Sequence, residues 1–247
     1  FEHWHFRTDK SWMKPENRKK WIEGTRKWAH HVNKVLGIPY KRFSLHIYDE
    51  VSGGGVGLFL KARQIVREAD PKVQVTMTIT SHITKTDFKK LDPAVEIWIP
   101  HMPLYKDKKS SFLIDMMEKT GKPIYPYLCA ENKRFWTPQY YRMLSWQTYK
   151  YKSKGLFMWT YLAGKAWQGR TWDGGMVFAG NGSVVPSRRW ELMRMGLQDW
   201  LLLDRAAKAG HRKTVDALVA AVVKEPENTK LFKESRQKLI KLLRNKR

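Results

Sequence analysis

The chain has 247 residues and a formal net charge of +24, and no segment approaches the roughly 18 consecutive apolar residues of a membrane-spanning helix. This length can bury one sizeable core, in one domain or two. The single cysteine, Cys129, excludes an intrachain disulfide, and the lack of a CxxC pair or Cys/His cluster argues against zinc. We therefore expect a chain with no metal, no cofactor and no membrane span.

The positive charge is spread along the whole chain rather than gathered in one arm. Basic runs occur at residues 18–20, 89–90, 106–109, 150–154 and 238–247. A field of this size attracts polyanions but does not identify them. Two interpretations stay open: a generally basic, solvated surface, or adaptation to acidic partners such as sulfated or uronate-bearing glycans.

Helical and strand-like apolar patterns alternate along the chain. In chain order they predict a helix at 15–36, a strand at 42–49, a helix at 58–69, a strand at 73–80, a short helix at 86–90, a strand at 95–100, a helix at 110–120, a strand at 123–129, a helix at 136–151 and a strand at 155–161. From residue 187 the pattern is helical to the end, with breaks at Gly210 and Pro226.

Five strands, each preceded by a helix, predict an α/β fold built on a parallel sheet. We expect the later strands of a (β/α)8 barrel, with residues 1–247 as one domain and 187–247 as its closing helices. The active site of such a barrel lies at the carboxyl ends of its strands. The alternative is a doubly wound sheet, which usually carries a phosphate-binding fingerprint near its first strand. Gly53-Gly-Gly-Val-Gly57 has neither GxGxxG nor Walker spacing, so we interpret it as a flexible loop beside the site.

Two adjacent acids, Asp49 and Glu50, stand where the first predicted strand ends. A glycosidase needs an acid to protonate the leaving oxygen and a nucleophile to capture the oxocarbenium-like centre. When the sugar's own 2-acetamido oxygen is that nucleophile, the second carboxylate only has to orient the acetamido nitrogen. We assign Glu50 as the acid/base and Asp49 as the orienting group. The competing interpretation is a helix N-cap or an ion pair with a basic residue, and Glu131 keeps a conventional two-carboxylate mechanism open.

Aromatic and polar side chains near the predicted strand ends are the candidates for substrate binding, because sugar rings stack on flat apolar faces and hydrogen-bond to amphipathic rings. These candidates are Tyr48, His46, His101, Tyr127, Asn132, Trp159, Tyr161, Trp167 and Trp172. Tryptophans on helical stripes are instead expected in the core, namely Trp12, Trp21, Trp28, Trp190 and Trp200. Arg142 and the arginines at 188–194 are expected to form scaffold ion pairs.

Several spaced segments resemble one family. Tyr48-Asp-Glu50 resembles the catalytic Asp-Glu signature of glycoside hydrolase family 123 and the related domain of unknown function 4091. The further matching segments, in the same order as in that group, are 142–146, 154–159, 173–178, 186–191 and 194–200. The resemblance covers about residues 38–205. It implies a (β/α)8 glycosidase acting on β-linked N-acetylgalactosamine, secreted or periplasmic, with further barrel strands or a β-sandwich domain upstream.

One segment departs from the family pattern. Val51-Ser-Gly53 follows the acids where Arg-Pro is frequent in the family, so the loop beside the site differs.

Two other functions stay open. The chain could be a catalytically silent carbohydrate-binding relative, or a basic protein that binds nucleic acid or another polyanion. Nucleic acid is the less favoured partner, because the sequence contains no RNP segment, helix-turn-helix or zinc-finger motif.

Overall fold

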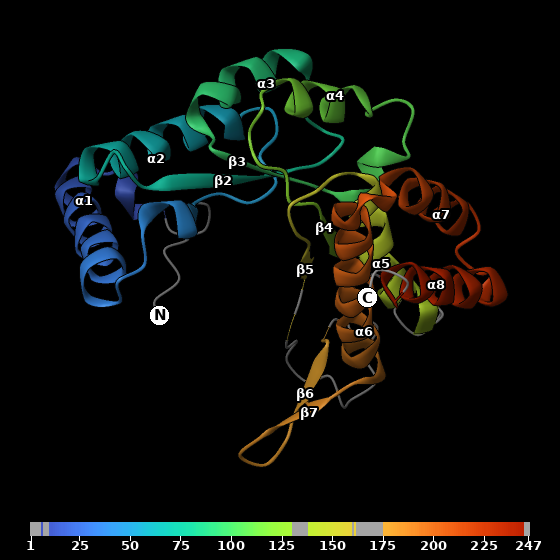
Figure 1. The fold of residues 1–247 in the computed structure, drawn as a ribbon. Helices are drawn as coiled ribbons and strands as arrows, with labels where there is room; N and C mark the ends of the chain where they lie inside the picture. The colour runs from blue at the N-terminus through green and yellow to red at the C-terminus, as the bar shows by residue number, and fades with distance from the viewer. Residues whose placement is uncertain (1–5, 7–9, 130–137, 160, 162–174, 245–247) are drawn as a thin grey trace. The chain divides into compact units, whose positions relative to one another are not determined.

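The structure, a computed structural model, describes residues 6, 10–129, 138–159, 161 and 175–244. Within it the chain divides into two compact units, residues 1–127 and 128–247 (Figure 1). Each unit has a hydrophobic core of its own. Among the described residues, no helix combines the length and the apolar character needed to cross a bilayer.

Helices and parallel strands alternate in the first unit, as the sequence predicted. Its elements are α1 (Pro15–His30), β1 (Ser44–His46), α2 (Gly55–Ala69), β2 (Gln74–Ile79), α3 (Lys85–Leu91), β3 (Ile97–Pro100) and α4 (Phe112–Lys119). β4 (Tyr127–Cys129) begins at the boundary with the second unit. One turn of π-helix, His31–Val35, extends α1, and Gly37 then leaves the helix with a φ of +66°.

The sheet of the first unit is parallel and keeps the strands in chain order. β2 pairs with β1 on one side and with β3 on the other. Isolated bridges from Trp98 to Ile124 and from His101 to Tyr127 continue the parallel order toward β4. A doubly wound sheet reverses its strand order at a switch point, and the strands described here show no such reversal. The α/β class and the order of the strands are therefore as predicted, although the described residues do not contain a complete barrel.

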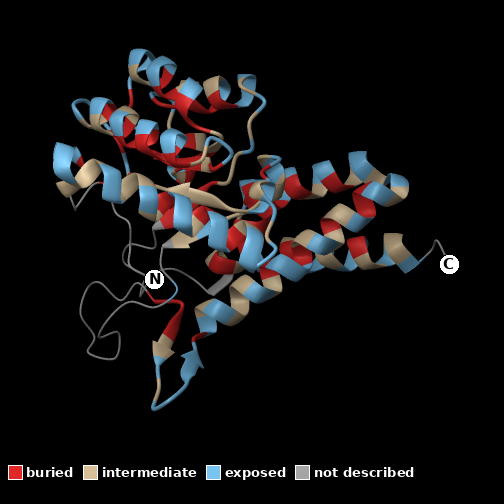
Figure 2. Ribbon diagram, turned by 90° about the vertical axis from the view of Figure 1, so that its left-hand side faces the viewer, coloured by how far each residue is buried: buried red, intermediate tan, exposed pale blue. Residues whose placement is uncertain are grey.

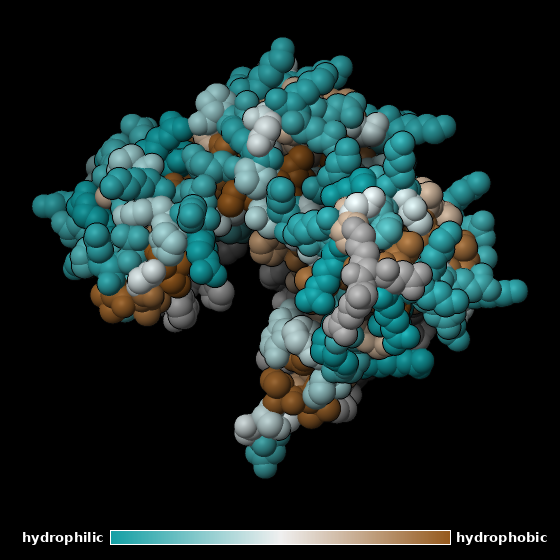
Figure 3. All heavy atoms as spheres, viewed as in Figure 1, coloured by the Kyte–Doolittle hydropathy of each residue, from teal (hydrophilic) through white to brown (hydrophobic). Residues whose placement is uncertain are grey.

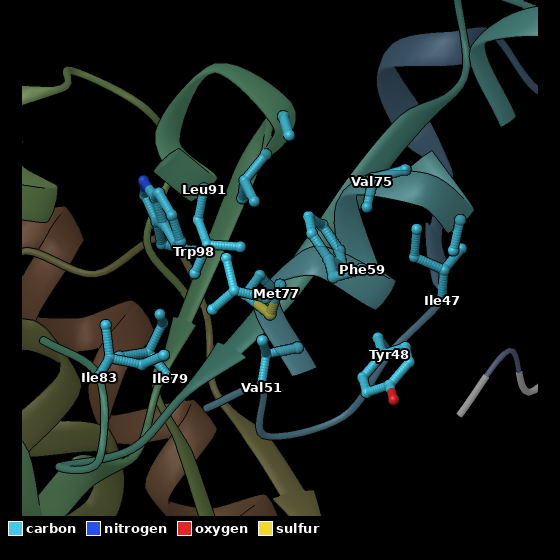
Figure 4. Packing of buried hydrophobic residues seen from close by; sticks show 14 of the residues in the cluster. Ile47, Tyr48, Val51, Phe59, Val75, Met77, Ile79, Ile83, Leu91 and Trp98 are labelled. Atoms are coloured by element: carbon cyan, nitrogen blue, oxygen red, sulfur yellow. The ribbon is translucent and has the colours of Figure 1, made fainter. Parts of the chain in front are cut away.

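The central strand β2 has side chains buried on both faces. Val75, Met77 and Ile79 point to one face and are fully buried, since alternate residues of a strand share a face. Figure 4 shows Met77 close to Phe59 of α2 and Leu91 of α3. Figure 2 shows the matching pattern on the helices, which are buried on one side and exposed on the other. The opposite face of β2 carries two buried threonines, Thr76 and Thr78.

A buried arginine connects α2 to the amino-terminal ends of β2 and β3. The guanidinium of Arg63 donates to the carbonyl oxygens of Ala94 (3.1 Å) and Val73 (3.3 Å) and to Glu96 Oε1 (2.7 Å). Glu96 Oε2 accepts from the amide of Val75 at 2.6 Å. Burial lowers the pKa of the Arg63 guanidinium, and the charge of Glu96 opposes that shift. One side chain of α2 thus satisfies acceptors on the two segments that lead into β2 and β3.

The second unit is mainly helical. Its elements are α5 (Pro138–Lys150), β5 (Phe157–Trp159), β6 (Val177–Ala179), β7 (Val184–Pro186), α6 (Arg188–Ala206), α7 (Arg212–Lys224) and α8 (Thr229–Arg244). β5 pairs with β4, and β6 and β7 form an antiparallel hairpin that the sequence did not predict. The helices begin and break as predicted: Ser187 caps α6 by accepting from the amide of Trp190, and Gly210 interrupts the chain with a φ of +94°.

A fully buried carboxylate connects three helices of this unit. Asp199 of α6 accepts from Arg142 of α5 at 2.6 and 2.9 Å and from Arg236 of α8 at 2.8 Å. The prediction of a scaffold role for Arg142 is confirmed. Gly196, one turn earlier on α6, allows the close approach of α5, since a Cβ there would lie 2.7 Å from the carbonyl oxygen of Arg142.

Two sequence expectations differ from the fold. The glycine-rich segment is only partly a loop, because α2 already begins at Gly55 and includes Gly57. Trp190, expected in the core, is 36% exposed and packs edge-on against Tyr161. By contrast, Trp12 is buried, and Trp21 and Trp28 pack against the core of the first unit as predicted.

Replacing Arg63 with Met should lower the free energy of unfolding by about 2–4 kcal/mol, because buried carbonyl oxygens and Glu96 lose their donor. Arg67→Met is the matched control on the same helix. Arg67 is exposed and donates only to Pro93, so a loss below about 1 kcal/mol is expected. Urea unfolding followed by circular dichroism measures both, and equal losses would contradict the anchoring role.

Replacing Gly196 with Ala should destabilise the second unit by about 1–3 kcal/mol, because the added methyl group meets the backbone of α5. Gly57→Ala makes the same change in a helix with nothing within 4 Å of the new Cβ. This control should gain about 0.5–1 kcal/mol from helix propensity. Thermal unfolding compares the two, and a stabilised Gly196→Ala variant would rule out the close α5–α6 contact.

Candidate functional site

Side chains from four successive strands meet near the carboxyl end of the parallel sheet. Asp49 and Glu50 follow β1, Thr78 is the penultimate residue of β2, His101 follows β3, and Tyr127 pairs with His101 at the start of β4. All five belong to the first unit. The carboxyl ends of parallel strands lie at one edge of a sheet, which is where α/β folds bind ligands.

The acid pair stands on a sharp turn of the backbone. β1 ends at His46, and the next two residues, Ile47 and Tyr48, are buried in the core (Figure 4). The chain then turns at Asp49 and Glu50, and Glu50 has a φ of +46°. For a residue with a Cβ this left-handed conformation costs about 1–2 kcal/mol, so surrounding contacts must hold it.

A single hydroxyl from β2 contacts both acids. Thr78 Oγ1 donates to Asp49 Oδ1 at 2.9 Å and accepts from the backbone amide of Glu50 at 2.7 Å. Thr78 is 7% exposed, while the side chain of Asp49 is 41% exposed and Glu50 is exposed. The two carboxylates therefore reach solvent from a buried support.

The side chain of Glu50 has a partner at the start of β4. Tyr127 Oη donates to Glu50 Oε1 at 2.5 Å, although the two residues are 77 positions apart in sequence. The ring of Tyr127 lies 4.9 Å from that of His101, tilted by 33°. Tyr127 is 6% exposed, so its ring is fixed while its hydroxyl reaches the acid. Tyr127 thus holds the Glu50 side chain, while Thr78 holds its backbone amide.

Asp49 has a second neighbour in the last residue of β1, the strand that precedes it. His46 Nε2 lies 3.5 Å from Asp49 Oδ1, and His46 Nδ1 lies 3.2 Å from Thr76 Oγ1. Thr76 in turn donates weakly to the carbonyl oxygen of Leu45, at 3.4 Å. The carboxylate of Asp49 is therefore restrained from two sides, by Thr78 and by His46.

The structure describes the side chains of five predicted substrate-binding residues. His46 and Tyr127 contact the acid pair and His101 packs against Tyr127, whereas Tyr48 packs in the hydrophobic core with 7% of its surface exposed. Tyr161, in the second unit, is 47% exposed and contacts Trp190.

The remaining predicted binding residues are described in part or not at all. Trp159 ends β5, and only its backbone is described. Asn132, Trp167 and Trp172, together with Glu131, lie outside the described residues. Their roles stay predictions.

Sequence reasoning missed Thr76 and Thr78. A signal was present, because Val75-Thr-Met-Thr-Ile79 alternates apolar and hydroxyl side chains in a strand that was predicted to be buried. Two buried hydroxyls on one face require partners, and the neighbouring acids are such partners.

The chemistry available at this edge is that of carboxyl groups, a phenol and imidazoles. In the described part of the chain, no group of three or more His, Cys, Asp or Glu side chains is arranged to hold a metal ion. One exposed acid bound by a tyrosine and one restrained acid, adjacent in sequence, can act in different roles on the same small substrate.

No protein-family profile matches the sequence, and no curated protein matches it. Among solved structures, the chain is similar to a family 123 glycoside hydrolase from Clostridium perfringens, analysed for glycolipid glycan hydrolysis. The TM-score is 0.61 at 10% sequence identity, and the match covers 91% of this chain and 44% of that one. The chain therefore spans less than half the length of this relative.

Two structures of a family 5 mannosidase from Rhizomucor miehei are also similar, at 13% and 14% identity. They cover 76% and 78% of this chain and 59% and 60% of their own, with TM-scores of 0.49 and 0.44. The match to the Clostridium perfringens protein confirms, at the level of fold, the resemblance that the motifs indicated: over most of its length, the chain has the fold of a family 123 glycoside hydrolase.

Proposed function

We propose that the protein is a retaining glycoside hydrolase that cleaves β-linked N-acetylgalactosamine with the help of the sugar's own 2-acetamido group. The observation that carries this proposal is the acid pair itself: two adjacent carboxylates at the carboxyl end of β1, each held by a different partner. The fold of a family 123 glycoside hydrolase supports the same function.

In the proposed mechanism, Glu50 protonates the oxygen of the leaving group as the glycosidic bond breaks. The acetamido carbonyl oxygen attacks the anomeric carbon, and Asp49 accepts a hydrogen bond from the acetamido nitrogen as an oxazolinium-like intermediate forms. Glu50, now a carboxylate, takes a proton from the water that opens this intermediate. The configuration at the anomeric carbon is retained, because both steps invert it.

The surroundings of the two acids favour this division of roles. An orienting carboxylate has to be fixed in direction, and Asp49 is restrained by Thr78 and His46. An acid/base has to exchange protons with the leaving group and with water, and Glu50 is exposed. Tyr127 fixes the Glu50 carboxyl group through Oε1. Both acids are restrained, and Glu50 is the more exposed of the two.

His46, His101 and Tyr127 are the proposed contacts for the sugar hydroxyls and the acetamido group, since they lie beside the acids. Trp159, Tyr161, Asn132, Trp167 and Trp172 are retained as proposed contacts from the rest of the chain. Tyr48 is proposed to act indirectly, because its ring is buried in the core that supports the acid turn. The chain as a whole is proposed to form the later strands of a (β/α)8 barrel with helices closing it.

The substrate is proposed to be a glycan that carries N-acetylgalactosamine. Glycans that also carry sulfate or uronate groups are the first substrates to test. Figure 3 shows hydrophilic side chains over most of the face that it presents, and the net charge of +24 favours approach of sulfated or uronate-bearing chains. A secreted or periplasmic location would give access to such glycans.

Glu50→Gln should lower kcat/KM for an activated aryl N-acetyl-β-galactosaminide by about 100- to 10,000-fold, because the amide cannot exchange the catalytic proton. Asp49→Asn should lose activity as well. Glu118→Gln, an exposed acid on α4, is the control and should keep wild-type rates. Retained turnover in Glu50→Gln would refute the assignment, and sugar binding without turnover in the wild type would indicate a carbohydrate-binding relative.

Glu50→Gly should keep or raise the free energy of unfolding, by up to about 1 kcal/mol, while hydrolysis is lost. Glycine adopts the left-handed conformation without a Cβ clash, which offsets the lost bond to Tyr127. Lys152→Gly is the matched control, since Lys152 has a φ of +52° away from the acids. Denaturant unfolding measures both, and a loss above about 1 kcal/mol in Glu50→Gly alone would contradict a conformation kept for catalysis.

A further inference from the structure

We propose that Thr78 is a positioning residue that aligns the two acids, and that β2 thereby controls the geometry of catalysis. The inference rests on the proposed function of Asp49 and Glu50. Thr78 is on a different strand from the acids and is 28 and 29 positions from them in sequence. Its hydroxyl is the contact that reaches the backbone of one acid and the side chain of the other.

The roles of the hydroxyl are determined by its partners. A carboxylate only accepts hydrogen bonds and a backbone amide only donates them. The single proton of Thr78 Oγ1 must therefore point to Asp49 Oδ1, and a lone pair must face the amide of Glu50. Rotation of the hydroxyl cannot satisfy both partners in any other way, so the contact selects one arrangement of the acid turn.

The strand that carries Thr78 is suited to act as a fixed reference. β2 is hydrogen-bonded on both edges, and Thr78 itself pairs with Ile99 of β3. Its neighbours Met77 and Ile79 are fully buried on the opposite face. Displacement of Thr78 would disturb the core, whereas the acid turn at the end of β1 has no regular strand pairing beyond His46.

The strained backbone of Glu50 gives the contact its importance. A residue with a Cβ stays at a φ of +46° only where its surroundings over-determine the conformation. The bond from the Glu50 amide to Thr78, at 2.7 Å, restrains the backbone, and the bond from Tyr127 restrains the side chain. Loss of the first restraint would let the turn relax and swing the Glu50 carboxyl group away from its catalytic direction.

Thr78→Val is the informative change, because it replaces the hydroxyl with a methyl group and keeps the shape of the side chain. The expected result is a fall in kcat of about 10- to 100-fold with KM changed less than about threefold, as a misaligned catalytic group slows the reaction more than it weakens binding. Thr78→Ser keeps the hydroxyl and should retain kcat within about threefold of the wild type.

Thr25→Val is the matched control for the loss of a buried hydroxyl. Thr25 lies on α1 of the same unit and is 2% exposed. It should leave kcat and KM unchanged. A merely structural role for Thr78 would lower the Tm and the folded fraction of Thr78→Val without changing kcat per folded molecule, and that result would overturn the proposal.

The leaving group provides a second readout. If Thr78 aligns Glu50, the loss in Thr78→Val should be larger for phenyl than for 4-nitrophenyl N-acetyl-β-galactosaminide, because the poorer leaving group depends more on the acid. Equal losses of kcat on both substrates would mean that the alignment of Glu50 is not the affected step, and would limit the role to Asp49.

A crystal structure of Thr78→Val adds a readout that does not require turnover. Glu50 should leave the left-handed region or lose its contact with Tyr127, whereas an unchanged turn would overturn the proposal. Failure of the proposed function is recognised separately. If Glu50→Gln is as active as the wild type, the glycosidase assignment fails, whereas an inactive Glu50→Gln beside a fully active Thr78→Val rejects only the role of Thr78.

Discussion

The structure of the first unit depends on a strand that is buried on both faces. β2 presents Val75, Met77 and Ile79 to the helices. On its other face, Thr76 contacts His46 at the end of β1 and Thr78 contacts the acids that follow β1. The first row contributes the apolar burial that holds the helices on the sheet, and the second contributes directed hydrogen bonds. One strand therefore couples the stability of the core to the geometry of the acid pair.

The same division between scaffold and site recurs in the charged residues. Arg63 and Asp199 are buried, and each satisfies several partners on different segments. Asp49 and Glu50 have polar partners too, but their side chains reach solvent. Asp49 is held by the Thr78 hydroxyl and by His46, and Glu50 by the Tyr127 hydroxyl.

Much of this arrangement could be predicted from sequence, and the limits have physical causes. Strands such as 73–80 and 95–100 are rich in β-branched and apolar residues, so their positions were predictable. The acids were found because they stand where such a segment ends. The role of Thr78 was not, since threonine is common in strands for its shape alone. The hairpin of β6 and β7 was not predicted, because its strands are three residues long and largely exposed.

The adjacency of the acids has a consequence for how this protein can change. Asp49 and Glu50 share a peptide bond, so their spacing is covalent, and their direction is fixed by β2 rather than by the residues that follow them. Between the acids and α2, Ser52 and Gly54 are exposed and can therefore vary without moving the acid pair, whereas Val51 is buried in the core and Gly53 has a φ of +48°. For the proposed glycosidase, these exposed positions are where substrate preference can diverge while the acid pair keeps its geometry.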